Sequence, residues 1–447
     1  MSHYKPYPAY KDSGVKWLGR VPEHWYVVRM RYAATLNPPV RRDLLDDPDQ
    51  EVSFLPMEAI GEDGSLNLEQ NRPVADVRSG YSYFEDGDVA FAKVTPCFEN
   101  GKGALMRGLQ CAAGFGTTEL TVLRPNPAVA DARYINYIVQ GSSFRAFGAG
   151  AMTGAGGLKR VPDEFTRNFP VSLPELGEQR VIASNLDRET ARIGALIEKK
   201  TRFIELLREK RQALITHAVT KGLDPSVKMK NSGVEWLGEV PEHWRVMAIK
   251  HIVATPITDG PHETPEFIDE GVPFVSAEAV SSGRVDFAKI RGFISRNDHE
   301  RYSQKYCPKR GDIFMIKSGA TTGVTAIVET DDEFNIWSPL AVIRCGESAD
   351  PYFVLNFMRS RSFQEAVALS WSYGTQQNIG MGVIGNLAVT VPPLDEQKRI
   401  ALSVHAQCVR LDDLIDKTEC SIALLKERRS ALITAAVTGQ IDLREAV

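Results

Sequence analysis

Two polar segments, at corresponding places in the two halves of the chain, carry side chains that can contact nucleic acid. Residues 93–102 read Lys-Val-Thr-Pro-Cys-Phe-Glu-Asn-Gly-Lys, and residues 317–323 read Lys-Ser-Gly-Ala-Thr-Thr-Gly. Lys, Asn, Ser and Thr can reach phosphates and base edges, and glycine lets the backbone come close. The candidate contacts are Lys93, Thr95, Asn100, Lys102, Lys317, Ser318, Thr321 and Thr322. The alternative is a plain hairpin turn in each half.

A second pair of segments comes just before two predicted long helices. Residues 154–160 end in Leu-Lys-Arg and offer cations, whereas residues 374–380 contain Gln-Gln-Asn and offer amides. Arg suits guanine, and Gln and Asn suit adenine. The candidate contacts are Lys159, Arg160, Gln376, Gln377 and Asn378. The alternative is a flexible hinge between a globular domain and a helix.

A basic run covers residues 284–317, with nine basic and four acidic side chains and aromatic residues between them. Phosphate contacts from this run, with Arg291 and Arg296 as candidates, would supply affinity. The alternative is a solvated surface over an aromatic core. Residues 1–172 carry 19 basic and 20 acidic side chains, and residues 225–391 carry 16 and 20. Since nucleic-acid-binding domains are usually basic, any DNA contact here must be local.

Other chemistry has little support in the sequence. Asn37-Pro38-Pro39-Val40 is similar to the Asn-Pro-Pro-aromatic motif of amino-methyltransferases, but valine cannot stack on a flipped base. The chain has no GxxxxGK[ST] phosphate loop. Its six scattered cysteines form no CxxC motif and lie at no zinc-ligand spacing, so we expect buried, reduced thiols. We therefore expect no catalytic, cofactor-binding or metal-binding residues.

The chain is an internal duplication. Residues 13–25 (SGVKWLGRVPEHW) return as residues 232–244 (SGVEWLGEVPEHW), with 11 of 13 positions identical. The LGEQR segment at 176–180 matches LDEQK at 394–398, and ALITHAVT at 213–220 matches ALITAAVT at 431–438. Each half is therefore a variable globular domain followed by a well-matched segment.

The matched segments are predicted to be long helices that begin after Pro174 and Pro392. Apolar residues recur on alternating four- and three-residue steps, which is typical of a coiled-coil seam. They are Ile193, Ile197, Ile204, Leu207, Leu214 and Ala218, then Leu411, Ile415, Ile422, Leu425, Leu432 and Ala436. The same seam positions are polar in both copies, at Lys200 and Arg211 and at Thr418 and Arg429. These residues either fix the register or extend their polar ends into water.

The order of segments predicts four regions: 1–172 and 225–391 are globular, and 173–224 and 392–447 are helical. Because the second helix must return toward the first domain, the helices should be antiparallel and the two termini should be neighbours. At 1.5 Å per residue, a helix of about 45 residues makes a rod of roughly 65–70 Å with a domain at each end, related by a pseudo-twofold axis. The fold class is α+β.

Short runs of β-forming residues predict strands in both globular domains. They are Val52–Leu55, Val89–Ala92, Leu120–Leu123, Phe274–Val275, Ile313–Ile316 and Leu340–Ile343. Helical patterns cover Ala132–Phe147 and Pro351–Leu369. No apolar run reaches the roughly 20 residues of a membrane span, and the N-terminus lacks the apolar core of a secretory signal. We therefore expect a soluble, cytoplasmic protein.

Over essentially its whole length the chain resembles the specificity subunits of Type I restriction–modification systems. The resemblance lies in the SGVxWLGxVPEHW openings, the PxLxEQ helix starts, the ALITxAVT helix ends and the segment order. It implies that each globular domain is a target recognition domain for one half of an asymmetric, bipartite site in double-stranded DNA. It also implies that the helices set the spacing and dock methyltransferase subunits, with two such subunits expected and restriction subunits optional. The resemblance implies no catalysis by this chain.

Three alternatives stay open. The chain could serve a complex that only methylates DNA, without a restriction subunit. An adenine methyltransferase with its own recognition domains is a second alternative, although only 36 residues precede Asn37 and none form a Gly-rich cofactor segment. A coiled-coil scaffold without DNA contact is the third, but it does not explain two diverged globular domains.

Overall fold

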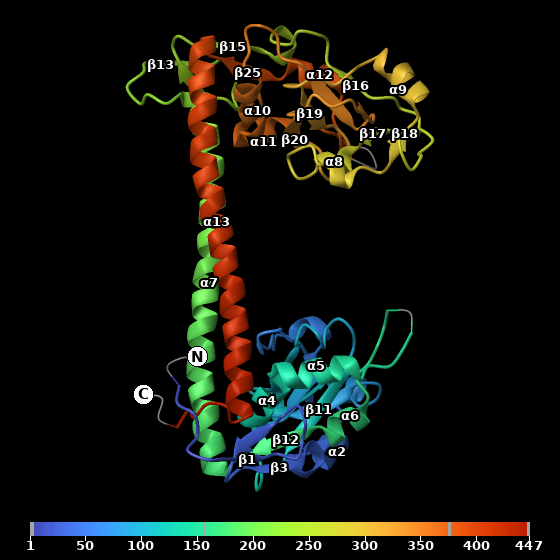
Figure 1. Cartoon of the computed structure of the whole chain (residues 1–447), viewed down its shortest axis with the longest axis vertical. Coiled ribbons are helices and arrows are strands. Elements are labelled where there is room, and N and C mark those ends of the chain that lie inside the picture. The colour runs from blue at the N-terminus through green and yellow to red at the C-terminus, as the bar shows by residue number, and fades with distance from the viewer. Residues whose placement is uncertain (1–3, 156, 374–376, 445–447) are drawn as a thin grey trace. The chain divides into compact units, whose positions relative to one another are not determined.

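The computed structural model describes residues 4–155, 157–373 and 377–444. The chain divides into two compact units. Unit 1 comprises Met1–Thr201 and Cys420–Val447, and unit 2 comprises Arg202–Glu419. Each unit thus contains one predicted globular domain and part of each long helix, and both belong to the predicted α+β class (Figure 1).

The two matched segments form the two long helices, α7 (Leu176–Lys221) and α13 (Leu394–Val437). The seam residues predicted from the sequence are all buried or half-buried. Within unit 2, Arg208 pairs with Glu419 at 3.0 Å and Arg211 pairs with Asp412 at 3.2 Å. Residue numbers rise on one helix as they fall on the other, so the predicted antiparallel pairing is confirmed there (Figure 1).

The globular part of unit 1 is built on two four-stranded sheets. Their strand orders are β6-β5-β10-β7 and β4-β11-β8-β9, with a two-stranded pair, β3 and β12, beside the helix start. The strands are β1 (Tyr10–Asp12), β2 (Arg20–Pro22), β3 (Tyr26–Arg29), β4 (Ala34–Leu36), β5 (Glu51–Leu55), β6 (Asn71–Pro73), β7 (Ser82–Glu85), β8 (Val89–Ala92), β9 (Gly103–Leu105), β10 (Ala113–Gly116), β11 (Leu120–Pro125) and β12 (Pro170–Leu173). The shorter helices are α1 (Met30–Ala33), α2 (Arg42–Asp46), α3 (Val74–Val77), α4 (Ala132–Gln140), α5 (Ser142–Gly150) and α6 (Asp163–Asn168).

Unit 2 repeats this plan. Its four-stranded sheet has the order β16-β22-β19-β20, which matches β4-β11-β8-β9, and β15 pairs with β25 as β3 pairs with β12. The strands are β13 (Met229–Asn231), β14 (Glu239–Pro241), β15 (Arg245–Ala248), β16 (Thr258–Asp259), β17 (Val272–Val275), β18 (Phe293–Ile294), β19 (Ile313–Ile316), β20 (Thr325–Ile327), β21 (Asn335–Ile336), β22 (Leu340–Ile343), β23 (Ser372–Tyr373), β24 (Gln377–Asn378) and β25 (Ala388–Val391). The shorter helices are α8 (Ala277–Val280), α9 (Arg296–Ser303), α10 (Pro351–Arg359), α11 (Arg361–Leu369) and α12 (Met381–Asn386).

All six predicted strands are present, but the two predicted helical patterns are each broken once. The break lies at Gly141 between α4 and α5, and at Ser360 between α10 and α11. Both residues have extended backbone, with ψ of 143° and 148°. The kink turns both members of each helix pair onto the core, so apolar residues on both sides of the break are buried.

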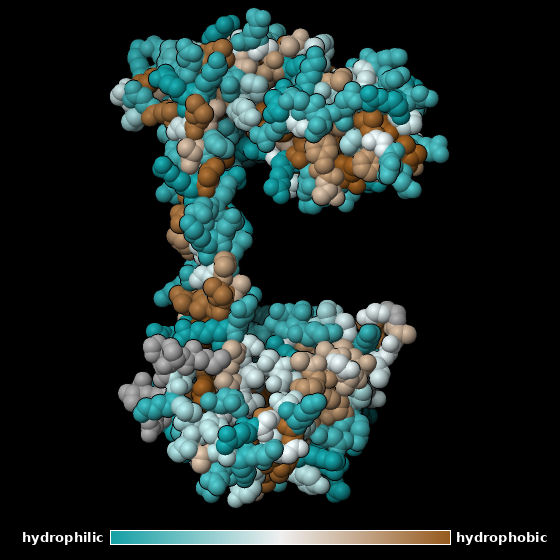
Figure 2. Space-filling view, viewed as in Figure 1, coloured by the Kyte–Doolittle hydropathy of each residue, from teal (hydrophilic) through white to brown (hydrophobic). Residues whose placement is uncertain are grey.

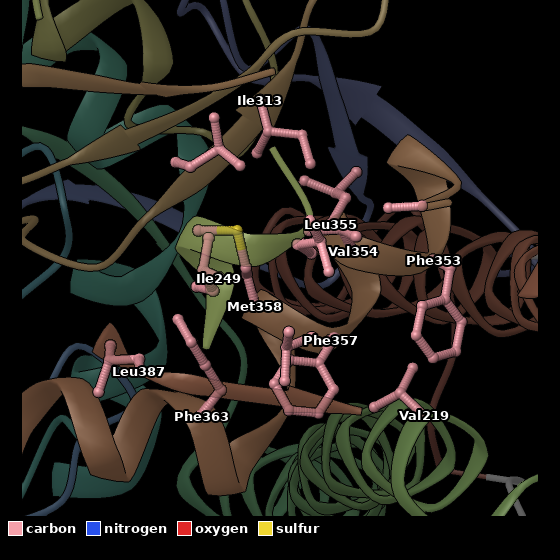
Figure 3. Packing of buried hydrophobic residues seen from close by; sticks show 14 of the residues in the cluster. Val219, Ile249, Ile313, Phe353, Val354, Leu355, Phe357, Met358, Phe363 and Leu387 are labelled. Atoms are coloured by element: carbon pink, nitrogen blue, oxygen red, sulfur yellow. The ribbon is translucent and has the colours of Figure 1, made fainter. Parts of the chain in front are cut away.

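The core of each unit continues onto a long helix. In unit 2, Phe353, Phe357 and Phe363 from α10 and α11 pack in one cluster with Val219 of α7 (Figure 3). Trp25 and Trp244, from the repeated opening segments, are fully buried. The repeated tryptophans are therefore core residues that join each globular domain to a helix.

A buried glutamine repeats the same anchoring contacts at the start of each long helix. Gln179 Oε1 accepts a hydrogen bond from the backbone N–H of Asp131, and Gln397 Oε1 accepts one from that of Asp350. Both side-chain amides also donate to backbone carbonyls on the approach to the helix. Because Asp131 and Asp350 are N-caps of α4 and α10, the repeated Gln fixes one helix start against another.

The chain ends meet in unit 1, as predicted: the backbone N–H of Asp442 donates to Lys5 O at 2.8 Å. The prediction of buried thiols is wrong for Cys111, Cys307 and Cys420, which are exposed. Cys111 lies in a short 3-10 helix, Cys307 in an irregular segment and Cys420 on the exposed face of α13. Within the described ranges, the helices lack the combination of length and apolar character that crossing a bilayer requires.

Candidate nucleic-acid interface

In both units the structure brings together the two segments that the sequence singled out. In unit 1, Val94 forms an isolated antiparallel bridge with Arg160, and the N–H of Val161 donates to Lys93 O at 2.8 Å. In unit 2, Ser318 bridges Asn378, and the N–H of Ile379 donates to Lys317 O at 2.9 Å. The same backbone pairing therefore places Arg160 in one copy where the other copy has Asn378.

Some side chains of segment 93–102 in unit 1 make hydrogen bonds within the protein, and others face solvent. The backbone N–H and the hydroxyl of Thr95 both donate to Lys159 O, at 3.0 and 3.2 Å. Lys102 Nζ donates to Met57 O at 3.1 Å. Asn100 and the Lys159 side chain are exposed, and Lys93 is half-buried. Thr95 and Lys102 thus shape the loop, whereas Asn100 and Lys159 face solvent.

Arg160 makes a two-pronged contact with Glu119, which sequence reasoning missed. Arg160 Nε lies 2.8 Å from Glu119 Oε2, and Nη2 lies 2.7 Å from Oε1. The hydrogen bond from Arg160 lowers the pKa of Glu119 below its usual value, although burial opposes this shift. The two residues are 41 positions apart, and no local pattern signals the pair; only the expectation that β11 runs beside the Lys93 loop could have suggested it.

The first residue of segment 317–323 in unit 2, Lys317, forms an ion pair with a buried carboxylate. Lys317 Nζ lies 2.9 Å from Asp259 Oδ2, and Lys305 Nζ lies 2.6 Å from Asp259 Oδ1. Asp259 is 1% exposed. Burial by itself raises the pKa of Asp259, but the hydrogen bonds from the two lysines outweigh it and hold the pKa below its usual value. Lys317 is therefore a partner of Asp259.

The remaining polar residues of this segment lie on a tight turn. Gly319 has a φ of 98°, which favours glycine, and Thr322 Oγ1 donates to Gly319 O at 2.7 Å. Ser318 and Thr321 are half-buried, and Asn378 is exposed. Gln377 belongs to β24, and Gln376 lies outside the described residues.

The basic run 284–317 is balanced by carboxylates from other segments. Arg296 pairs with Glu333 at 2.5 Å, and Arg291 lies 3.9 Å from Glu278 and over the ring of Trp337. Five more of its nine cations have acidic partners: Lys289 with Asp286, Arg301 with Glu263 and Asp298, Lys305 and Lys317 with Asp259, and Arg310 with Asp331. The run does not form a continuous positive surface.

Asn37, the first residue of the methyltransferase-like segment, has a structural role. Its Oδ1 accepts the backbone N–H of Val122 at 3.0 Å, and its Nδ2 donates to Asp163 Oδ2 at 3.2 Å. Both ends of the amide are thus engaged within unit 1. Among the residues that the structure describes, no group of three or more His, Cys, Asp or Glu is placed to hold a metal ion.

Comparison with known proteins points to one family. A family model described as the Type I restriction modification DNA specificity domain matches residues 241–418. The chain is 38% identical over 170 residues to the Type I restriction enzyme EcoEI specificity subunit of Escherichia coli, a match covering 38% of this chain and 28% of that protein. It is 39% identical over 180 residues to the EcoAI specificity subunit of the same species, covering 40% and 30%. These matches thus span less than a third of either relative.

The fold is also known. A chain from a structure described as the basis of complex assembly and conformational transition of the type I R-M system aligns with a TM-score of 0.74. The alignment covers 94% of this chain and 99% of that one at 19% identity. The chain is thus similar to Type I restriction specificity subunits in sequence over part of its length, and to a chain of a type I R-M system in fold over nearly all of it.

Proposed function

We propose that this chain is the DNA sequence-specificity subunit of a Type I restriction–modification complex, in which each globular domain reads one half of an asymmetric, bipartite site. The observation that carries the proposal is the repeated pairing of two polar segments, Val94 with Arg160 and Ser318 with Asn378. The two domains keep the same backbone pairing but carry different exposed side chains on it. Two related domains that read different bases require this combination.

The two half-sites should differ in sequence. Arginine forms paired hydrogen bonds with guanine, and asparagine with adenine. Because one copy presents Arg160 where the other presents Asn378, the two domains select different base pairs at equivalent places. Lys93, Lys159 and Asn100 are further candidate contacts in the first domain, and Ser318 and Thr321 in the second.

The long helices serve as the docking surface for methyltransferase subunits in this proposal. Hydrophobic surface is visible on the helix pair in Figure 2. In unit 2, Phe203, Leu206 and Leu414 are 43–47% exposed, and in unit 1, Leu196 and Leu424 are 43% and 59% exposed. Exposed leucines on a helix that already has a buried seam suit a second layer of packing. The internal repeat fits two methyltransferase subunits, with or without restriction subunits.

The chain itself has no catalytic role in this proposal. The amide of Asn37, which an adenine methyltransferase would use on its target base, is held by Val122 and Asp163. A complex that only methylates is the second candidate, and the choice between the two depends on the partner subunits. The protein would act on DNA in the cytoplasm.

The test is a methylation map of the host genome with and without this gene. Loss of one asymmetric, bipartite methylated motif on deletion, and its return on complementation, is the expected result. If every methylated motif survives deletion, the gene is restored on an expression plasmid together with its methyltransferase gene. Failure of that strain to gain a bipartite motif would reject the proposal.

A further inference from the structure

The Arg160–Glu119 pair leaves one edge of the guanidinium unused. Arginine has five N–H donors, and Glu119 engages the side edge through Nε and Nη2. The end edge, formed by Nη1 and the second hydrogen of Nη2, makes no hydrogen bond to any residue the structure describes. The Arg160 side chain is 48% exposed and that of Glu119 is 26% exposed. The pair therefore presents a flat fork of two donors toward solvent.

The backbone beneath this fork is held from two sides. Arg160 bridges Val94 on one side and Thr153 on the other. Its N–H donates to Thr153 O at 2.8 Å, and its carbonyl accepts from the Thr153 N–H at 3.0 Å. With the Cα fixed by the ladder and the side edge fixed by Glu119, little side-chain freedom is left to lose when a ligand binds.

We propose that Arg160 reads a guanine in the half-site of the first domain through its free end edge, and that Glu119 is the positioning residue that fixes the plane of its guanidinium. This rests on the proposed function, because it names the base that one recognition domain selects. The two end-edge donors match the spacing of the O6 and N7 acceptors of guanine in the major groove.

A guanine fits the geometry better than a phosphate does. Phosphate contacts position a protein without reading sequence, and Lys93 and Lys159 already supply cations beside Arg160 for that purpose. A carboxylate next to Arg160 offsets its charge and would weaken a purely electrostatic contact. The same carboxylate helps a base reader, because it fixes the orientation of the fork.

The test uses the full-length chain in complex with its methyltransferase subunits, and duplexes in which each base pair of the methylated motif is replaced in turn. Arg160→Lys keeps the charge but loses the fork. We expect this variant to lose roughly 5- to 150-fold of its discrimination at one G·C pair of one half-site, the range that corresponds to about 1–3 kcal/mol. Glu119→Gln should lose discrimination at the same pair and at no other.

A matched control is available in unit 2. Arg310 makes a similar side-edge contact with Asp331, with Nε and Nη2 at 3.0 and 2.7 Å from Oδ2. Arg310→Gln should leave the base preference unchanged in both half-sites. Thermal unfolding of each complex shows whether the variants fold as the wild type does.

The salt dependence of binding separates the two roles of Arg160. A base contact leaves the slope of log K against log salt nearly unchanged, whereas a lost phosphate contact lowers it by about one. A uniform loss of affinity across all duplexes with a shallower slope in Arg160→Gln would overturn the inference. So would unchanged discrimination at every G·C pair in Arg160→Lys. If the wild-type complex instead has no preferred motif, the proposed function itself fails.

Discussion

The indole Nε1 of Trp25 donates to Glu178 Oε1 at 3.1 Å, and the same bond recurs between Trp244 and Glu396 at 3.1 Å. His24 and His243 approach the second oxygen of these carboxylates, each at 2.8 Å. In each unit, the repeated opening segment thus forms hydrogen bonds with the start of a long helix, and this contact is called a joint below. Each joint ties a globular domain to the first turn of a long helix.

Removing the carboxylate of Glu178 in unit 1 should destabilise the protein more than removing that of Glu396 in unit 2. Glu178 also accepts a hydrogen bond from Tyr7 at 2.9 Å and lies near Arg444, whereas Glu396 lacks the tyrosine partner among the described residues. We expect Glu178→Ala to lower the free energy of unfolding by about 1–3 kcal/mol, since the buried Trp25 N–H loses its acceptor. Glu396→Ala should cost less. Urea unfolding of both variants checks this, and equal losses would contradict it.

Lys93 and Lys317, which begin the two equivalent polar segments, should respond differently to mutation. Lys93 is half-buried with no acidic partner within 4.0 Å in the described chain, whereas the Lys317 side chain is 13% exposed and pairs with Asp259. Lys317→Met should therefore destabilise the protein by about 1–3 kcal/mol, because the buried carboxylate loses a donor. Lys93→Met should change stability by less than about 0.5 kcal/mol and affect mainly DNA affinity. Chemical unfolding and DNA titration of both variants separate the effects.

The ion pairs of Asp259 with Lys305 and Lys317 also predict that the stability of the protein falls in acid. The folded-state pKa of Asp259 lies below the unfolded value of about 3.9. Its contribution is present above that unfolded value and is lost as the pH falls through the lower, folded value. Between pH 5 and 2, the unfolding midpoint should therefore fall less steeply for Asp259→Asn than for the wild type. Parallel curves for the two proteins would contradict this expectation.

The strands and the long helices could be predicted from the spacing of apolar residues along the sequence. The strands Val89–Ala92 and Ile313–Ile316 are continuous apolar runs, and the long helices carry a regular seam, so both follow from periodicity. The breaks at Gly141 and Ser360 were not predicted, because tertiary packing bends a pattern that is helical on both sides.

The candidate interface was only partly predictable, because its charged residues form ion pairs with residues far away in the sequence. Arg296 was a candidate contact on composition alone, yet its partner Glu333 lies 37 positions away. Glu119 was absent from the candidates because a lone acidic residue next to a strand has no signature. The pairing of Val94 with Arg160 likewise requires knowing that two distant segments share an edge.

Thiol labelling should separate the exposed cysteines from the buried ones. Burial raises the pKa of Cys345 to about 12, so very little of it is thiolate at pH 8. Cys307, in the same unit, is exposed. With iodoacetamide we expect Cys111, Cys307 and Cys420 to react first and Cys345 and Cys408 to react only on unfolding, as mass spectrometry of peptides would show. Cys345 is half-buried, so its slow reaction follows from its raised pKa, and labelling of native Cys345 as fast as Cys307 would contradict that shift.

Charged residues on the exposed helix surface should block assembly without unfolding the chain. Leu206 is 47% exposed and Leu414 is 43% exposed, so an aspartate at either site can stay hydrated in the free protein. In a packed interface the same aspartate would be buried without a partner, at a cost of several kcal/mol. We expect Leu206→Asp and Leu414→Asp to lower methyltransferase affinity at least tenfold in co-purification and titration.

The control for this surface is Leu369→Asp at the last residue of α11, because Leu369 is 84% exposed and does not belong to either long helix. This variant should assemble as the wild type does. All three variants should keep the free energy of unfolding within about 0.5 kcal/mol of the wild-type value, since surface substitutions rarely cost more. If Leu206→Asp and Leu414→Asp assemble normally while Leu369→Asp does not, the methyltransferase docks on the globular domain and the assignment of the helix surface is wrong.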